Sequence, residues 1–489
     1  MGGKRLLKLF LGPVLGFIAA MLLSSYGHPP LMSRMAFVAV WMAAWWITEA
    51  VNIFFTALLP LVLFPVLGIM GMKEVAPSYT NEIIFLFVGG FLIAFTLEKW
   101  NLHKRIALYL LLRIGKTPAT VLLGFMIASF FLSMWIVNTA TTMMLLPAVL
   151  AVVKQLEDQR KKKEPALATA LLLGLAYSSS IGGTATIIGT APNMVFMGFF
   201  NDHFKNLPAI NFTNWILYSL PVAVLFLICC YLVLKKRFLK DIGNAPIDLV
   251  ECDREYKQLG PMSYEERAIT IVFILTVILW FFRQDIVLGN ITIPGWSGIL
   301  PHPEYFKDST VAMLSACILY LIPSRSATGT GLLTWDQVQR IPVGIIFLFG
   351  GGFALAAGIT SSGLSDWIAS GLSGLQGVPP WLVVLTLCVF MTFFTELTSN
   401  TASTYLLLPM VMGITLQFTE NPLLFMVPVV LSASYAFMLP VATPPNTIVF
   451  GSERVSMKDM IKTGLILNLI GVAINMLGIY TLARWLWDM

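Results

Sequence analysis

The stretch that decides the fold runs from residue 118 to residue 153 and reads PATVLLGFMIASFFLSMWIVNTATTMMLLPAVLAVV. As one straight helix it would extend about 54 Å, at about 1.5 Å per residue, far beyond the roughly 30 Å hydrocarbon core of a bilayer. Basic residues stand on both flanks, with Arg113 and Lys116 before it and the run 154–163 after it, so both ends are expected on the same, inner side of a membrane. The stretch therefore predicts a re-entrant hairpin of two half-helices, with its tip near residues 137–142.

A second apolar segment, residues 378–420, is also too long for a single crossing, but it lacks the basic residues that flank the first. It contains no Lys or Arg and carries Ser399-Asn400-Thr401 at its middle. Polar backbone at such a depth is tolerated only where protein buries it or a wet cavity receives it. We therefore expect a second hairpin that enters from the outside.

The two hairpins belong to an internal repeat. The sequence FLFVGGF at 85–91 matches FLFGGGF at 347–353, and the same offset of 262 positions carries Asn138 to Asn400. Each half also has a motif that interrupts an apolar span; these motifs are Gly189-Thr190-Ala191-Pro192-Asn193 and Ala442-Thr443-Pro444-Pro445-Asn446. Two halves that each hold a hairpin and a broken helix, entering from opposite faces, are typical of an inverted-repeat secondary transporter with its site near the midplane.

The composition of the whole chain agrees with a membrane location. Of 489 residues, 57% are hydrophobic and 11% are charged, whereas an ordinary soluble domain has about 25% charged residues. The long continuous apolar runs exclude the alternating pattern of an outer-membrane barrel. The formal net charge of +6 then reports orientation, and we expect no nucleic-acid partner. The five cysteines show no paired spacing, so neither a disulfide framework nor a thiolate metal site is indicated.

At about 20 apolar residues per crossing, we expect an all-α polytopic protein with eleven crossings, an inside N-terminus and an outside C-terminus. The crossings are placed near 7–25, 35–52, 54–71, 82–98, 167–200, 213–234, 266–283, 310–323, 342–362, 424–451 and 464–487. Of the 31 Lys and Arg residues, all but six fall in the proposed inside segments, which agrees with the positive-inside rule. The six are Arg34, Lys73, Lys205, Arg283, Lys307 and Arg484.

This topology divides the chain into four parts. They are N-terminal scaffold helices (1–53), a first inverted repeat (54–234) with hairpin 118–153, a cytoplasmic linker (235–265), and a second inverted repeat (266–489) with hairpin 378–420. Within the last part, residues 284–308 are expected to form an outside loop that could carry a short interfacial helix.

The polar clusters offer two kinds of chemistry. Helix N-termini with free N–H groups, each end worth about half a positive charge, suit carboxylate or sulfate oxygens together with Asn and Thr side chains. Carbonyls with Ser, Thr and Asn oxygens suit Na⁺. Because no Lys or Arg lies inside the clusters, bound sodium should raise the affinity for a divalent anion, and the coupling should be reciprocal.

Each signal has a structural alternative. A single Ser, Thr or Asn in a membrane helix more often just bonds to a neighbouring helix, but duplicated clusters at hairpin tips favour a site. Glu49 and Glu396 are functional candidates because they lie in apolar surroundings, although a satisfied structural acid at a span end is the favoured interpretation. Gly182-Gly183 beside the serines 178–180 could serve close packing or the site. His103, in a basic interfacial stretch, is expected to be solvated.

Taken together, the two tip motifs and the two broken-helix motifs resemble those of the divalent anion/sodium symporter family, which includes bacterial dicarboxylate transporters and animal citrate and sulfate carriers. The likeness covers nearly the whole chain. It implies an elevator-type transporter, a homodimer and at least two Na⁺ sites. Two positions depart from the family pattern: Val137 stands where the first tip normally has serine, and Ala191 where a proline is usual.

The resemblance also implies roles for particular residues. The sodium ligands would be Ser133, Val137, Asn138 and Gly189 in the first half, and Thr395, Thr398, Asn400 and Ala442 in the second. The substrate would contact Asn138, Thr139, Thr190, Ser399, Asn400, Thr401, Thr443 and Pro444.

We therefore expect a sodium-coupled symporter of C4-type dicarboxylates such as succinate, malate or fumarate, located in the cell inner membrane. The alternatives are a dicarboxylate exchanger, a sodium-coupled carrier of sulfate or a tricarboxylate, and an anion channel. An enzyme is the weakest alternative, since the sequence has no HExxH motif, nucleophile elbow or phosphate-binding glycine loop beside a catalytic base.

Overall fold

The computed structural model describes residues 3–240, 242, 246–247, 249–288, 291–327, 329–371, 374, 377–419 and 421–487. Glu420, at which the second hairpin was expected to end, lies outside this set, as do five positions of the expected linker. Within the described residues, eight helices are long and apolar enough to cross a membrane, and several shorter apolar helices accompany them.

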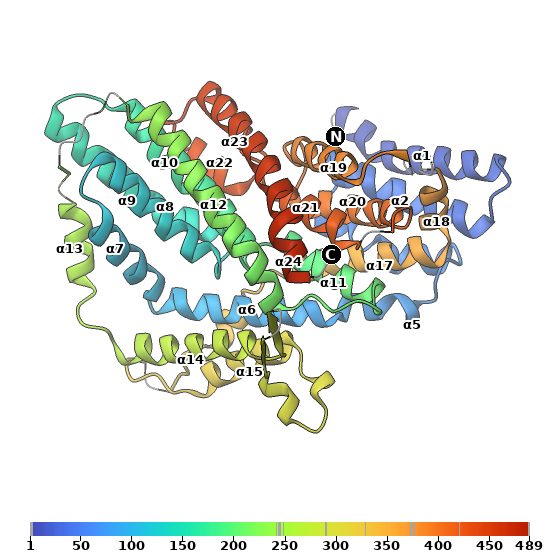
Figure 1. Ribbon diagram of the computed structural model, residues 1–489, viewed down its shortest axis with the longest axis horizontal. Coiled ribbons are helices and arrows are strands. Elements are labelled where there is room, and N and C mark those ends of the chain that lie inside the picture. Colours follow the sequence, from blue (N-terminus) through green and yellow to red (C-terminus); the bar gives the residue numbers. More distant parts are fainter. Residues whose placement is uncertain are drawn as a thin grey trace.

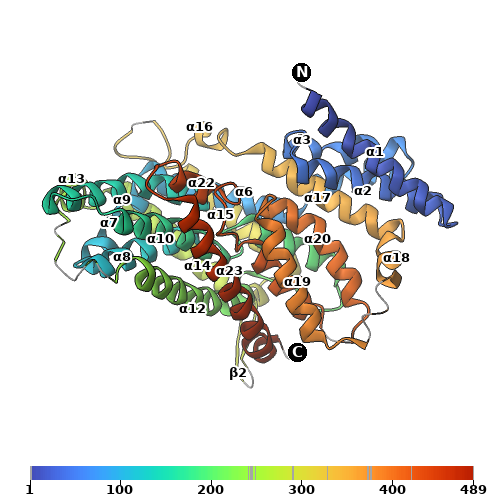
Figure 2. The same cartoon turned by 90° about the horizontal axis from the view of Figure 1, so that it is seen from above.

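The chain is almost entirely helical (Figures 1 and 2). The helices up to residue 238 are α1 (Gly3–Ser25), α2 (Pro30–Thr48), α3 (Ile53–Thr56), α4 (Leu59–Val66), α5 (Met72–Val75), α6 (Glu82–Lys99), α7 (Leu102–Ile114), α8 (Pro118–Ser133), α9 (Asn138–Arg160), α10 (Pro165–Thr184), α11 (Ala191–His203) and α12 (Phe212–Phe238). The later helices are α13 (Val250–Gln258), α14 (Tyr264–Phe281), α15 (Asp308–Leu321), α16 (Trp335–Val338), α17 (Val343–Ser361), α18 (Leu364–Gly371), α19 (Pro380–Thr395), α20 (Asn400–Thr415), α21 (Leu423–Ala433), α22 (Pro444–Phe450), α23 (Met457–Gly478) and α24 (Arg484–Trp487). Short 3₁₀ helices cover Ala76–Thr80, Trp296–Ile299 and Pro303–Tyr305, and a π-helical turn covers Ile479–Ala483.

Both stretches that are too long for one span fold as helix pairs. The first becomes α8 and α9, which pack on each other, and the second becomes α19 and α20 (Figures 1 and 2). The helical backbone stops because Val137 and Ser399 adopt extended conformations, with ψ of 136° and 132°. Each pair therefore has a turn at the motif that the sequence placed at its tip.

The two interrupted spans also appear as expected. The first divides into α10 and α11, and the second into α21 and α22. Thr190 and Thr443 are extended immediately before the second helix of each. Pro192 and Pro444 then lie in a first helical turn, where proline's fixed φ and missing N–H are tolerated.

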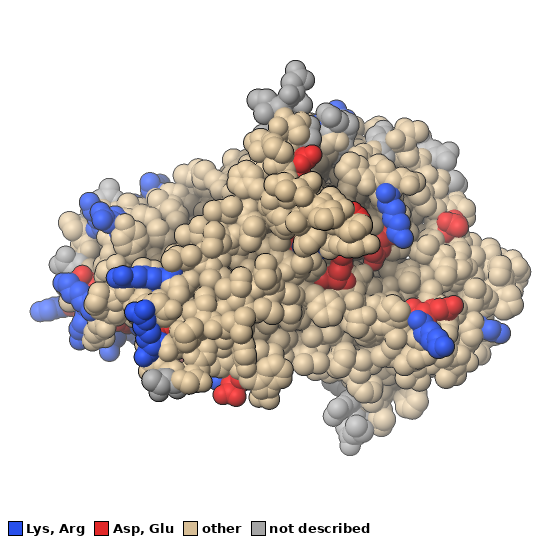
Figure 3. All heavy atoms as spheres, turned by 90° about the horizontal axis from the view of Figure 1, so that it is seen from below, with Lys and Arg blue, Asp and Glu red and all other residues tan. Residues whose placement is uncertain are grey.

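Two ion pairs join segments that the positive-inside rule places on the same side of the membrane. Arg105 binds Glu266 with Nε to Oε1 at 2.7 Å, and Arg454 binds Glu157 at 2.8 Å. All four residues come from segments expected inside. Figure 3 shows most Lys and Arg residues of this face at the end where α7, α9 and α13 lie in Figure 1, and fewer at the opposite end, where Asp and Glu residues accompany them.

Two details differ from the expected architecture. The loop 284–308 contains a small antiparallel pair, β1 (Ile286–Leu288) and β2 (Ile291–Ile293), so the chain is not purely helical; β-branched residues in both strands favour this pairing. The third expected crossing, 54–71, is divided into α3 and α4, because Pro60 opens α4 and Pro65 lies near its end.

The two intramembrane acids have ordinary structural surroundings. Glu49 is exposed at the end of α2. Glu396 is buried, and its carboxylate accepts hydrogen bonds from the backbone N–H groups of Phe437, Met438 and Leu439 at 2.8, 2.9 and 3.1 Å. The Asn468 amide adds a fourth bond at 2.7 Å. Glu396 therefore holds the unwound segment between α21 and α22 against the second hairpin.

This geometry predicts that Glu396→Leu strongly destabilises the protein. Three buried N–H groups would lose their acceptor, at a total cost of at least about 3 kcal/mol. Thermal unfolding of the detergent-purified protein, followed by loss of the monodisperse size-exclusion peak, should occur at a clearly lower temperature. Glu49→Gln is the control and should stay within about 0.5 kcal/mol of the parent protein. Equal unfolding temperatures for Glu396→Leu and the parent would contradict the assigned role.

Candidate functional site

The tips of the two hairpins are open helix N-termini. α9 begins at Asn138 and α20 at Asn400, and neither preceding residue, Val137 nor Ser399, caps its helix with a side chain. A serine at this position usually accepts a hydrogen bond from the first turn, so the Ser399 hydroxyl is left for another partner. The first backbone N–H groups of each helix lack intrahelical acceptors. Both tips can therefore donate hydrogen bonds to an anion.

The broken helices offer fewer donors than the hairpins. Pro444 and Pro445 open α22 and have no N–H, and the N–H of Asn446 is 3.4 Å from Thr443 Oγ1. In the first half, Ala191 takes the opening position of α11 and retains its N–H. The departure at Ala191 thus adds a backbone donor that a proline would lack.

Behind the first tip lies a cluster of buried oxygens. Ser133 Oγ donates to Asn138 Oδ1 at 2.6 Å, and Ser179 Oγ donates to the Asn138 carbonyl at 2.9 Å. A Cβ on Gly183 would come within 2.4 Å of Asn138 Oδ1, so glycine is needed for the asparagine to fit. Gly183 and Ser179 of α10 therefore pack closely against Asn138 at the first tip.

The second tip repeats this arrangement. Thr395 Oγ1 lies 2.8 Å from Asn400 Oδ1 and 2.9 Å from the Ala433 carbonyl. Thr398 Oγ1 and Ser403 Oγ are hydrogen-bonded to each other. In both halves, the hydroxyl of the residue five positions before the asparagine is thus hydrogen-bonded to the asparagine's side-chain oxygen.

One asparagine in each broken helix holds the unwound segment in place by donating to its carbonyls. The bonds run from Asn193 to Gly183 (3.2 Å) and Thr186 (2.7 Å), and from Asn446 to Ala436 (3.0 Å) and Leu439 (3.0 Å). Corresponding residues of the two sets differ by 253 positions in every case. Each asparagine's Oδ1 is buried without a hydrogen-bond donor among the described residues. The sequence motifs end on these asparagines, but no role was expected for them.

The first half has its own link between the hairpin tip and the broken helix. Thr186 Oγ1 donates to the Met134 carbonyl at 2.5 Å and accepts from the N–H of Gly189 at 3.1 Å. Met134 corresponds to Glu396 at the offset of 262. A threonine hydroxyl therefore does in the first half what a carboxylate does in the second, and nothing in the local sequence singled out Thr186.

The two expected sets of residues differ in burial. Most of the expected cation ligands are buried, namely Ser133, Gly189, Thr395, Thr398 and Ala442. Most of the expected substrate residues are partly exposed, namely Asn138, Thr139, Thr190, Ser399, Asn400 and Thr401, while Pro444 is exposed. Thr443 is the exception because it is buried at 3% exposure. The arrangement places buried oxygens beneath an accessible layer of amide and hydroxyl groups.

The two halves pack crosswise around these motifs. α9 packs against α22, and α20 packs against α11. Within the part of the chain that is described, no hydrogen bond joins Asn138 to Asn400, so the structure brings each asparagine to its own hydroxyl partner but does not link the two tips directly.

The oxygens at both tips are uncharged. Over the described ranges, none of their hydrogen bonds or ion pairs involves Lys or Arg, and no three His, Cys, Asp or Glu residues gather as transition-metal ligands. Hydroxyl, amide and carbonyl oxygens are hard donors that suit an alkali cation. Free N–H groups suit an anion.

Relatives of this chain are similar to it over almost its whole length. The sodium-dependent dicarboxylate transporter SdcS of Staphylococcus saprophyticus is 37% identical over 490 residues, which cover 98% of this chain and 91% of that protein. The Na(+)/dicarboxylate cotransporter 3 of Homo sapiens is 35% identical and covers 99% of this chain and 93% of its own length.

Two solved structures share the fold at low sequence identity. The YdaH transporter of Alcanivorax borkumensis superposes with a TM-score of 0.57 at 14% identity, covering 84% of this chain and 88% of its own. MtrF of Neisseria gonorrhoeae superposes with a TM-score of 0.58 at 10% identity, covering 86% and 84%.

The family model described as "Sodium:sulfate symporter transmembrane region" matches residues 3–489, and with relatives at more than a third identity the chain belongs to this family of membrane transporters.

Proposed function

We propose that the protein is a sodium-coupled symporter that imports C4-type dicarboxylates such as succinate, malate or fumarate. The observation that carries this proposal is the pair of hairpin tips, each with free N–H groups and an asparagine bonded to a buried hydroxyl, without any basic side chain. The names of two similar relatives, a sodium-dependent dicarboxylate transporter and a Na(+)/dicarboxylate cotransporter, support this substrate class over sulfate. No feature of the site calls for a chemical reaction.

We assign the mostly buried oxygen groups to cation binding and the more exposed amide and hydroxyl groups to substrate binding. The first cation would be held by Ser133, Val137, Asn138 and Gly189, and the second by Thr395, Thr398, Asn400 and Ala442. The dicarboxylate would contact Asn138, Thr139, Thr190, Ser399, Asn400, Thr401 and Pro444, while Thr443 supports the wall of the pocket from a buried position.

The coupling has a simple electrostatic basis. Two carboxylates carry two negative charges, and two helix N-termini offer about half a positive charge each. The helix ends thus offset about one of the two negative charges, and the sodium ions bound beneath the tips offset the other with charge to spare, so the cations and the anion raise each other's affinity. A carrier built in this way binds the dicarboxylate weakly without sodium.

The proposed architecture has eleven crossings and two re-entrant hairpins in two inverted repeats, with the N-terminus inside and the C-terminus outside an inner membrane. It works as a homodimer in which the unit that holds both tips moves as an elevator against a scaffold. The ion pairs that join segments of one expected side, such as Arg105–Glu266, support this topology.

Uptake by the reconstituted protein should depend on sodium. In liposomes, an inward Na⁺ gradient should drive accumulation of labelled succinate, and replacement of Na⁺ by K⁺ should remove it, because only sodium fills the oxygen sites. Protein-free liposomes are the control. Equal uptake with both cations would exclude sodium coupling, and absence of uptake for dicarboxylates, citrate and sulfate alike would exclude the substrate class. Flux that does not saturate and shows no counterflow would indicate a channel.

Asn138→Ala and Asn400→Ala should each abolish sodium-driven succinate uptake while the protein still purifies as a monodisperse species. Each asparagine serves both an ion and the substrate, so neither half can replace the other. The matched control is Asn206→Ala, because Asn206 is exposed on the loop after α11. Full activity of either tip variant would mean that the site lies elsewhere.

Val137→Ser should lower the KM for succinate. The added hydroxyl restores at the first tip a group that Ser399 provides at the second, and one hydrogen bond of about 0.5–1.5 kcal/mol corresponds to a change of roughly 2–10-fold. Val137→Ala, which changes size without adding a donor, is the control. The same KM for both variants would show that this position does not face the substrate.

A further inference from the structure

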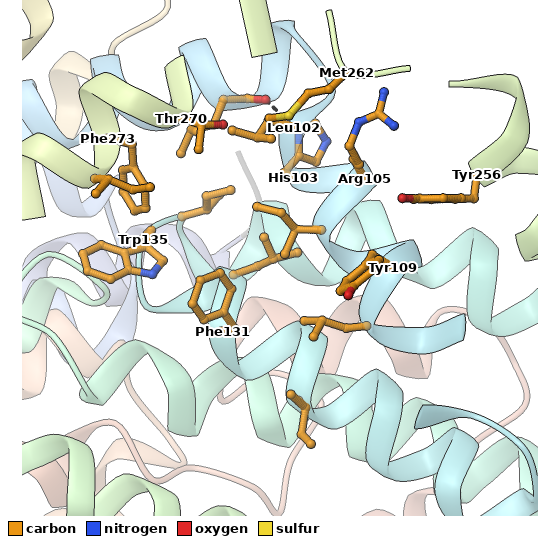
Figure 4. Close-up of a pocket in the computed structure, with 17 residues that line it drawn as sticks. Leu102, His103, Arg105, Tyr109, Phe131, Trp135, Tyr256, Met262, Thr270 and Phe273 are labelled. Carbon is orange, nitrogen blue, oxygen red and sulfur yellow. Dashed lines mark hydrogen bonds between the residues drawn. The ribbon is translucent and has the colours of Figure 1, made fainter. Parts of the chain in front are cut away.

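An apolar cavity of about 530 Å³ lies between α7, the first hairpin helix α8 and α14 (Figure 4). Its volume is in the range of cavities that hold small molecules, roughly 300–1,000 Å³. None of the residues assigned to ion or substrate binding lines it. The cavity is therefore separate from the proposed transport site.

The cavity has an apolar deep end and a polar rim. At the deep end, the rings of Trp135 and Phe273 meet edge to face at 4.9 Å, next to the first hairpin tip. At the other end lie Arg105, Tyr256 and His103 (Figure 4). The walls between them are aliphatic and aromatic, so the polarity of the cavity changes along its length.

His103 shows how the rim is built. It was expected to be solvated, but it is only 6% exposed, and its Nδ1 donates to the Leu97 carbonyl at 3.0 Å. Burial lowers the pKa of His103, which favours a neutral ring at neutral pH. The wall of the cavity at this point is therefore uncharged.

The rim is fixed by a bidentate ion pair. Arg105 contacts both oxygens of Glu266, at 2.7 and 3.0 Å, and also donates to the carbonyls of Gly260 and Leu259 at 2.9 and 3.2 Å. A bidentate guanidinium–carboxylate pair holds a defined geometry. The ion pair thus links α7 to the start of α14 at the rim of the cavity.

The side of the cavity is continuous with the exposed apolar surface. Tyr109, Phe131 and Ile274 line it and are 46%, 37% and 51% exposed. In a membrane-spanning chain, exposed apolar side chains of this kind face lipid. The lateral opening therefore gives hydrocarbon, rather than water, access to the cavity.

We propose that this cavity binds one acyl chain of a bilayer phospholipid, with the polar part of the lipid at the Arg105 end and the chain terminus at Trp135. Along α8 the cavity wall includes Ile127, Phe131 and Leu132, and it continues past the end of this helix to Trp135. An empty apolar void of this size would be strongly unfavourable, and apolar walls do not hold ordered water.

The proposal rests on the membrane location of the chain and not on which solute is carried. The bound chain would complete the packing of the face of α8 that carries Ile127 and Phe131, the arm that leads to the first tip. A lipid would thus act as a structural ligand between the hairpin and α14.

Trp135 provides a direct test. The parent protein and Trp135→Phe are reconstituted in phosphatidylcholine vesicles whose acyl chains are unlabelled or brominated near the chain terminus, and the difference in emission between the two proteins isolates Trp135. Bromine that contacts the Trp135 ring should quench this emission by about two-fold or more. The surrounding bilayer supplies the lipid in large excess, so the cavity should be occupied in most molecules. Quenching of the same emission by aqueous iodide instead of brominated lipid would show a water-filled cavity and overturn the proposal.

A filled cavity provides the second arm. Thr270→Phe/Ile274→Phe places two rings in the cavity and removes no bond between helices, because the Thr270 hydroxyl donates only to Glu266 O of its own helix. The matched control is Ile271→Phe/Leu275→Phe, two exposed positions with the same spacing. Brominated lipid should quench Trp135 less in the filled variant and unchanged in the control. Equal quenching in the filled variant and its control would overturn the proposal. If the filled variant does not fold, the quenching difference between the parent protein and Trp135→Phe is the test.

Discussion

A helix that is broken inside a membrane leaves about four C=O groups at one new end and about four N–H groups at the other without partners, and lipid cannot provide them. This constraint governs the whole site. Some of the exposed ends are satisfied by the protein: Glu396 receives three backbone N–H groups, and Asn193 and Asn446 donate to carbonyls of the unwound segments. The groups that remain at the tips are the ones that can bind an anion and cations. The groups available for binding are thus the backbone N–H and C=O groups of the broken helices that have no hydrogen-bond partner within the fold.

The two halves share the hydrogen bonds within their broken helices but differ in the group that joins the broken helix to the hairpin tip. The asparagine bonds of the broken helices are equivalent at a constant offset, whereas the link to the hairpin tip is a hydroxyl at Thr186 and a carboxylate at Glu396. The second half thus has a buried carboxyl group next to its oxygen cluster, where the first half has a hydroxyl. The two oxygen clusters therefore have different polar neighbours, although the same kinds of side chain form both clusters.

The fold was predictable where a length or a charge rule forces it. An apolar stretch far longer than a bilayer with basic residues at both ends has few solutions besides a hairpin, and the helix break falls at Val137, within the expected tip. Proline and an extended threonine likewise mark the broken helices. The small β pair at Ile286–Leu288 was missed because strands of three residues give almost no periodic signal.

Of the contacts in the candidate site, only those between residues of the repeated motifs could be predicted from the sequence. Ser133 and Asn138 are five residues apart, and the structure joins them as their duplication at Thr395 and Asn400 suggested. Thr186 and the partners of Glu396 depend on contacts between segments distant in sequence, which no local pattern records. The asparagines 193 and 446 were visible as repeated motif residues, and their equal offset from the carbonyls they bind is the signal that could have found them.

The absence of basic side chains at the tips also explains how such a site can release its solute. A lysine or arginine would be a permanent cation, and its attraction for a dicarboxylate would be the same at the start and end of a transport cycle. In the site proposed above, helix ends and neutral amides would hold the anion only as strongly as the bound sodium allows, because binding of one ligand changes the affinity for the other. When sodium leaves into a solution where it is scarce, the anion loses its counter-charge at the same moment. The direction of transport is then set by the sodium gradient and not by any residue of the protein.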